Sequence, residues 1–241
     1  MTLRATTCLA ENTDSMLRRW MEHLQGIGID IEFDEGLTTG ERLAMARSGD
    51  VDVLFACGLL TMELIALGTP LDVVAAPVFE SETEPVYRSV VICRADSEFE
   101  SVADAANLRL AVNEYASWSG WHGLRAYLQS IGLTVGNKPG GPFGSHMITG
   151  SHAASIEAVR SGRADVAAID HSLWSYLVAT DHDRLDGLAV VAQTSDWPAP
   201  PVTINTRLDV ATREALSTAL KSTPGLRAAS HSAYEFMLQG R

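Results

Sequence analysis

Two segments in the second half of the chain place serine, glycine and histidine side chains where a strand is expected to pass into a helix. The first contains Ser117, Ser119 and Gly120, and the second contains Ser151 and His152. Free N–H groups at a helix start bind oxyanions together with nearby hydroxyl groups, and an imidazole can donate a further hydrogen bond. The two segments predict a binding site for a small anion.

A structural role competes with this interpretation for each of these residues. Serine is common at the N-cap of a helix, so Ser117 or Ser119 would then only cap one. A lone histidine such as His152 is more often a surface or capping residue. Two serine-containing helix starts in one half of the chain are stronger evidence for a ligand than either segment alone.

Asp170 ends a predicted strand and is expected beside the same site. A carboxylate repels a fully ionised anion but accepts a hydrogen bond from a protonated oxyanion. Asp170 therefore favours a ligand that carries a proton or an amine. Its alternative role is to cap the helix expected from residue 172.

Aromatic side chains are available to line such a site. Tyr87 could offer a hydroxyl group, and four tryptophans could form its walls, although most tryptophans belong to a core. They are Trp118, Trp121, Trp174 and Trp197.

The sequence lacks the motifs of hydrolases, nucleotide-binding P-loops and metal sites. There is no G-x-S-x-G segment of a hydrolase and no P-loop, so the glycine-rich residues 136–144 predict a surface loop. His146 and His152 have no carboxylate at ligand spacing, and the three cysteines are scattered, so the sequence predicts neither a metal site nor a disulfide framework. We therefore expect no cofactor, no metal and no catalytic residue.

Strands and helices alternate along the chain, which predicts an α/β fold with mostly parallel sheets covered by helices on both faces. The expected strands are residues 2–10, 29–33, 51–56, 71–76, 86–93, 108–113, 188–194 and 202–205, with one more that follows Gly162 and ends at Asp170. The expected helices are residues 12–26, 41–47, 61–67, 119–131, 172–178, 209–221 and 226–238, with one more before Gly162. In such sheets ligands bind beyond the carboxyl ends of the strands.

One helix, turn and strand is present twice. The sequence Arg-Ser-Gly-x-x-Asp-Val starts at Arg47 and again at Arg160, and each copy leads to a predicted strand end, at Cys57 and at Asp170. The repeat predicts two lobes with a site between them. Proline-containing crossings at Pro85 and Pro198 divide the chain into a discontinuous lobe, residues 1–85 and 200–241, and a continuous lobe, residues 86–199, joined by a hinge.

Composition limits the class of protein. With 241 residues, 46% of them hydrophobic and 20% charged, the chain suits a soluble α/β protein. The net charge of −12 opposes binding to nucleic acid and to anionic membranes. No apolar stretch approaches the roughly 20 residues of a membrane-spanning helix. The sequence shows no signal peptide, so we expect either a cytoplasmic protein or a trimmed mature form.

The chain resembles the PhnD-like family, the substrate-binding proteins of phosphonate, phosphate and phosphite ABC transporters. The resemblance rests on four motifs: Tyr87-Arg88-Ser89, Ser117-Trp118-Ser119-Gly120, Gly150-Ser151-His152 and Gly162-Arg163-Ala164-Asp165. It implies a two-lobed, type 2 periplasmic-binding-protein fold, a periplasmic location and the membrane subunits of a transporter as partners.

The resemblance also implies which residues bind the ligand. The turns at residues 117–120 and 150–152 would hold the oxyanion, with Tyr87 and Asp170 lining the cleft and Cys57 and Gly58 contacting the ligand from the first lobe. The chain departs from the family at Trp118, where a small hydroxyl residue is common.

Two alternatives stay open from the sequence alone. One is a cytoplasmic enzyme on the same scaffold, of the menaquinone- or thiamine-pathway type, for which Glu114, His152 and Asp170 are the candidate acids and bases. The other is a sensor that reports ligand binding to a partner protein. Fold resemblance by itself does not separate them from a transport protein.

Overall fold

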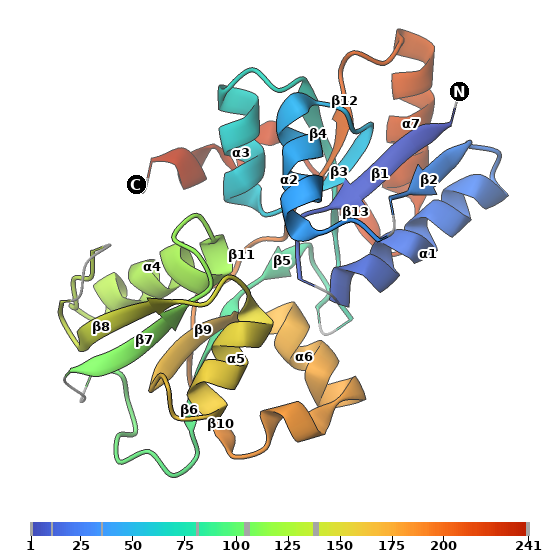
Figure 1. Cartoon of the computed structure of the whole chain (residues 1–241). Coiled ribbons are helices and arrows are strands. Elements are labelled where there is room, and N and C mark those ends of the chain that lie inside the picture. Colours follow the sequence, from blue (N-terminus) through green and yellow to red (C-terminus); the bar gives the residue numbers. More distant parts are fainter. Residues whose placement is uncertain are drawn as a thin grey trace. The chain divides into compact units, whose positions relative to one another are not determined.

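The computed structural model describes residues 2–10, 12–34, 36–80, 82–103, 107–136 and 140–239. Its helices and strands form two compact units (Figure 1). Unit 1 is Met1–Val86 with Pro198–Arg241, and unit 2 is Tyr87–Trp197. Each unit contains one large sheet.

The sheet of unit 1 has the strand order β13-β4-β12-β3-β1-β2. Its strands are β1 (Leu3–Thr7), β2 (Ile31–Phe33), β3 (Val53–Phe55), β4 (Leu71–Pro77), β12 (Val202–Asn205) and β13 (Leu226–Ala228). β1 is parallel to β2 and β3, whereas β12 is antiparallel to β3 and β4. The sheet is therefore mixed, and the expectation of a mostly parallel sheet holds only for β1 to β4.

Helices cover both faces of this sheet. They are α1 (Asn12–Gly26), α2 (Thr39–Ser48), α3 (Gly58–Ala66) and α7 (Val210–Ser222). Buried side chains of α1 and α7 form one apolar core with the sheet, which includes Trp20 packed edge-on against Phe55 with ring centroids 5.2 Å apart. Ala46 of α2 and Leu64 of α3 belong to a second core on the other face.

The sheet of unit 2 has the order β10-β6-β9-β7-β8. Its strands are β6 (Ser89–Arg94), β7 (Leu108–Val112), β8 (Phe143–Ile148), β9 (Val166–Asp170) and β10 (Leu188–Gln193). Its helices are α4 (Gly123–Ser130), α5 (His152–Arg160) and α6 (His171–Thr180), with a π-helical turn at Trp118–His122 before α4 and a 3₁₀ turn at His182–Leu185. β7 is parallel to β8 and β9, and β6 is antiparallel to β9.

Two short strands mark the places where the chain passes from one unit to the other. β5 (Val86–Tyr87) and β11 (Trp197–Pro198) pair as a two-stranded sheet. The N–H of Ala199 donates a hydrogen bond to the carbonyl of Pro85 at 2.8 Å. Prolines suit this place because they lack the N–H that a central strand needs.

The repeated Arg-Ser-Gly-x-x-Asp-Val segment has a structural explanation in its aspartate. Asp52 accepts a hydrogen bond from the backbone N–H of Arg4 at 2.9 Å, and Asp165 accepts one from that of Arg109 at 2.7 Å. Arg4 and Arg109 lie in β1 and β7, the strands that pair with β3 and β9. The repeated aspartate therefore links β1 to β3 in unit 1 and β7 to β9 in unit 2.

Two sequence predictions about elements were wrong. Residues 226–238 form strand β13 and two 3₁₀ turns, because Leu226, Arg227 and Ala228 pair with the end of β4. Gly144 lies in β8 and not in a loop; β8 is an edge strand with several exposed residues, so its apolar pattern is weak. Lys138 and Pro139, in the same predicted loop, lie outside the described residues.

The helix expected over residues 119–131 begins differently from an ordinary α-helix. The N–H of His122 donates to the carbonyl of Ser117 at 3.2 Å, five residues earlier, which makes a π-helical turn. Such turns occur often at functional sites. None of the helices within the described residues is long and apolar enough to cross a membrane.

Candidate functional site

The segments that contain the predicted ligand residues of unit 2 follow the carboxyl ends of its parallel strands. Asn113 follows β7, Thr149 follows β8, and Asp170 ends β9. β6 runs in the opposite direction, and its first residue, Ser89, pairs with Asp170. Tyr87, close before β6, therefore belongs to the same edge of the sheet.

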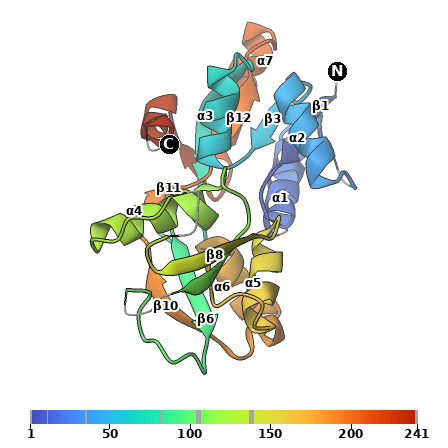
Figure 2. The same cartoon turned by 60° about the vertical axis from the view of Figure 1, so that its left-hand side comes forward.

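Three helices start at this edge, after β7, β8 and β9. Figure 2 labels the helices α4, α5 and α6 of this unit. Ser117 accepts a hydrogen bond from the N–H of Gly120 at 3.0 Å, and Ser151 accepts one from the N–H of Ala154 at 3.1 Å. Asp170 accepts from the N–H and the hydroxyl of Ser172, at 2.8 and 2.7 Å. All three side chains therefore cap helices, which is the alternative role that the sequence left open for Ser117 and Asp170. The helix starts direct their positive dipole ends to one edge, which favours an anion there.

Ser119 and His152 form the central polar contact of this edge. The Oγ of Ser119 lies 2.9 Å from Nε2 of His152, and the two residues are 6% and 8% exposed. The carbonyl of Ser119 accepts a hydrogen bond from the Ser89 hydroxyl at 2.7 Å, which fixes the turn against β6. The structure thus joins the two predicted oxyanion segments through a direct hydrogen bond.

Burial keeps the imidazole of His152 neutral. Desolvation lowers the pKa of His152 below its ordinary value, while the charge of Asp170 and a backbone hydrogen bond with Ala168 act in the opposite direction. A neutral imidazole donates from one ring nitrogen and accepts at the other. The Ser119–His152 pair can therefore present a hydroxyl or an N–H donor to a bound oxygen.

Asn113 belongs to the same group, although no local pattern distinguishes it among residues 113–120. It is 8% exposed, and its carbonyl accepts a hydrogen bond from the N–H of Gly150 at 2.9 Å. Its Oδ1 lies directly over Gly120: a Cβ on Gly120 would be 1.7 Å from that oxygen and 3.2 Å from Cε1 of His152. Gly120 is thus required by close approach of the Asn113 side chain.

Trp118 and Tyr87 are both buried at this edge. The Trp118 ring stacks on that of His122, with centroids 5.8 Å apart, and meets the ring of Trp197 edge-on at 5.1 Å. The bulky residue of the S-x-S-G turn therefore packs against the strand β11. Of the other predicted wall residues, Trp121 is a core residue and Trp174 is half-buried.

Cys57 and Gly58 lie in unit 1, where β3 passes into α3. The side chain of Cys57 does not cap α3. A Cβ on Gly58 would lie 2.7 Å from Sδ of Met237 and 2.9 Å from Cδ1 of Tyr234. Gly58 is therefore needed for packing of the C-terminal segment, a role that sequence analysis did not foresee.

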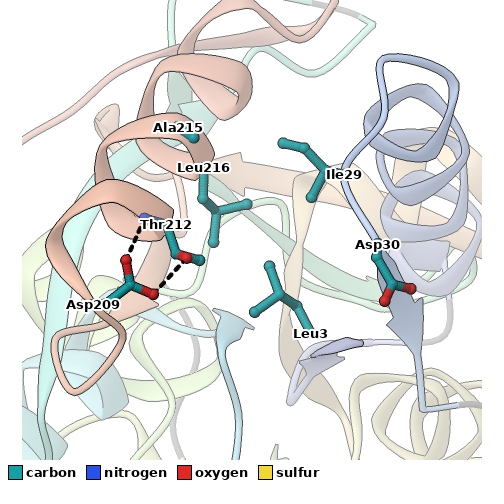
Figure 3. A pocket seen from close by; sticks show the side chains of 7 residues that line it. All are labelled: Leu3, Ile29, Asp30, Asp209, Thr212, Ala215 and Leu216. Carbon is teal, nitrogen blue, oxygen red and sulfur yellow. Dashed lines mark hydrogen bonds between the residues drawn. The ribbon is translucent and has the colours of Figure 1, made fainter. Parts of the chain in front are cut away.

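A pocket of about 380 Å³ lies elsewhere in unit 1, at the amino ends of β1 and β2 (Figure 3). Leu3, Ile29 and Leu216 point into it, and Asp30 and Asp209 lie at its sides. Hydrogen bonds from Thr212 lower the pKa of Asp209 and hold it as a carboxylate. This acidic pocket is unsuited to an anion.

Within the parts of the chain that the structure describes, there is no group of three or more His, Cys, Asp or Glu side chains arranged to hold a metal ion.

Two histidines, the buried His152 and the half-buried His146, predict a pH dependence of stability. Desolvation lowers the pKa of both His146 and His152 in the folded protein, whereas an unfolded histidine titrates near pH 6.5. As the pH falls, the unfolded chain takes up protons first, so the stability present above about pH 6.5 is lost in acid. We expect the free energy of unfolding to fall between about pH 7.5 and about pH 5.5.

Denaturant unfolding at a series of pH values measures this effect. His152→Gln should flatten the profile, and His182→Gln, at an exposed position, is the matched control for the substitution itself. A wild-type profile that is flat over this range would contradict the prediction.

The comparison with protein families decides what kind of protein this is. A model of the family described as "ABC transporter, phosphonate, periplasmic substrate-binding protein" matches residues 9–234. The chain belongs to this family. The sequence motifs predicted this family, and the prediction is confirmed. The members found by the comparisons are solute-binding proteins and not enzymes.

Solved structures agree with the family in fold. PhnD1 from Prochlorococcus marinus, in complex with methylphosphonate, has a TM-score of 0.83 at 15% identity, with 99% of this chain and 96% of that chain covered. A binding protein component of an ABC phosphonate transporter from Pseudomonas aeruginosa, PA3383, has a TM-score of 0.74 at 18% identity, with 98% and 83% covered. A search of curated proteins by sequence found no match. The predicted periplasmic-binding-protein fold is confirmed.

Proposed function

We propose that this phosphonate-type substrate-binding protein captures a small phosphonate, phosphate or phosphite ion in the periplasm and delivers it to the membrane subunits of an ABC transporter. The oxyanion binds at the carboxyl edge of the unit 2 sheet. The observation that carries the proposal is the buried Ser119–His152 hydrogen bond, 2.9 Å long, at an edge where three helices start.

The chemistry of this edge suits a tetrahedral anion. The Ser119 hydroxyl and the His152 imidazole lie together there beside three helix starts, and a hydrogen bond to a ligand is worth more in a buried site than in water. Similarity to a protein whose structure contains methylphosphonate supports the same class of ligand. Ser117, Gly120 and Ser151 shape the turns, and Tyr87, Trp118 and Asp170 line the site.

Closure of the site is part of the proposal. Residues 1–85 with 200–241 act as one lobe and residues 86–199 as the other, and the two short crossings serve as the hinge. Cys57 and Gly58, at the start of α3, contact the ligand from the first lobe. The second lobe binds the polar head of the ligand, and the first mainly closes over it.

Titration calorimetry with methylphosphonate, phosphate and phosphite tests the ligand class. We expect saturable one-to-one binding of at least one of the three, with a Kd in the micromolar range or below, which corresponds to at least about 8 kcal/mol of binding free energy. Absence of heat with all three ions, from protein shown to be folded by circular dichroism, would refute the proposed ligand class.

A further inference from the structure

Asn113 carries a buried acceptor that the fold does not use. Its side-chain Oδ1 is inaccessible to solvent and has no hydrogen-bond partner among the described residues. The residue as a whole is 8% exposed. Buried polar atoms in native proteins nearly always have a hydrogen-bond partner, so we expect this oxygen to have one in the functional state of the protein.

The oxygen lies within the proposed ligand site. The position that a Cβ of Gly120 would occupy is 1.7 Å from Oδ1 of Asn113 and 3.2 Å from Cε1 of His152. His152 is the partner of Ser119. The carboxamide of Asn113 therefore lies beside the imidazole edge that we expect to face the oxyanion.

Three donors of the protein near Asn113 are already engaged. The N–H of Gly120 donates to Ser117 Oγ at 3.0 Å, and that of Gly150 donates to the main-chain carbonyl of Asn113 at 2.9 Å. The hydroxyl of Ser119 is 2.9 Å from His152. A ligand that brings its own O–H donor into the site would supply the missing hydrogen bond to Oδ1.

We propose that Asn113 is a specificity-determining residue that accepts a hydrogen bond from a P–OH group of the ligand. The inference rests on the proposed function and deepens it. The site then selects a phosphonate that retains one proton over tetrahedral anions that have no proton to donate. Asp170 adds to the same selection, because its carboxylate, adjacent to His152, repels a fully ionised ligand.

Methylphosphonate and methanesulfonate form a matched pair of probes. Both are a methyl group on a tetrahedral anion, but in mildly acidic buffer only methylphosphonate carries an O–H donor. Calorimetry on the full chain gives the ratio of their dissociation constants. We expect the wild-type protein to prefer methylphosphonate by about a hundredfold, and Asn113→Ala to reduce that preference about tenfold, the loss of one hydrogen bond to the ligand.

Two further variants separate specificity from general damage. Asn113→Asp keeps an acceptor of the same shape and should retain the preference, which also provides a result if Asn113→Ala does not fold. Ser130→Ala, at the exposed end of α4, is the control and should leave the ratio unchanged. A structural role for Asn113 would weaken both probes equally and would not move the ratio.

Each outcome has a distinct meaning. If the wild-type protein binds neither probe nor phosphate nor phosphite, the proposed function fails and this inference fails with it. If methylphosphonate binds but methanesulfonate binds equally well, or if the ratio is the same in wild type and Asn113→Ala, the role of Asn113 is refuted while the proposed function stands. A ratio that falls in Asn113→Ala and persists in Asn113→Asp supports it.

Discussion

Ser119→Ala is expected to weaken methylphosphonate binding between about tenfold and a hundredfold while leaving the protein folded. The hydroxyl of Ser119 is bonded to His152 at 2.9 Å, and the turn's capping residue is Ser117. A hydrogen bond to a charged group contributes about 1.5–3 kcal/mol, which gives that range of affinities. Calorimetry on the purified variant measures the change.

Ser117→Ala is the matched control, two residues away in the same turn. Ser117 accepts from the N–H of Gly120 and caps the helix, so its loss should lower the free energy of unfolding by about 1 kcal/mol. Ser119→Ala should change stability much less than this. Equal affinities of wild type and Ser119→Ala would exclude Ser119 from the ligand site.

The contrast between these serines shows what the sequence could and could not predict. Ser117 and Ser119 have the same side chain, and both precede or enter a helix, so sequence alone left capping and ligand binding open for each. The π-helical turn gives them different contacts, because it places Ser117 Oγ over the N–H of Gly120 and turns Ser119 toward His152. Such a turn depends on tertiary packing and has no clear sequence signal.

Strongly patterned elements were predictable for physical reasons. Gly49 and Gly162 both have a positive φ after a helix, so glycine followed by an apolar run identified the same helix, turn and strand twice. The strand β8 and the C-terminal strand β13 were not recognised. Both are edge strands, whose formation is decided by the strand beside them and not by a local apolar pattern.

Asn113 illustrates the limit for the site. Its position directly after a buried strand is visible in the sequence, as is that of Asp170. Its Oδ1 is buried without a hydrogen-bond partner in the described part of the chain and lies close to Gly120 and to His152 of α5. These contacts join residues that are not neighbours in the sequence, so no local pattern indicates them. The residues that sequence identified are those whose capping or donor chemistry is itself local.

Gly120→Ala is expected to destabilise the protein through a direct clash with Asn113. The new Cβ would lie 1.7 Å from Oδ1 and 2.6 Å from Cγ of Asn113, so the buried carboxamide must be displaced. Overpacking of this kind costs about 1–3 kcal/mol of unfolding free energy. Because Asn113 then moves against His152, methylphosphonate affinity should fall as well. Denaturant unfolding and calorimetry on the variant measure the two effects.

The double variant Asn113→Ala, Gly120→Ala distinguishes this clash from a need for glycine flexibility. Gly120 lies in a helical turn and has no positive φ, so alanine suits its backbone and is the better helix former by about 1 kcal/mol. Without the Asn113 carboxamide, the nearest remaining atom is Cε1 of His152 at 3.2 Å, which needs only a small shift. Gly120→Ala should therefore cost much less in the Asn113→Ala background than in wild type, with a coupling energy of about 1–3 kcal/mol. Equal costs in both backgrounds would show that the glycine is required by its backbone and not by Asn113, and would remove the close contact on which the role of Asn113 rests.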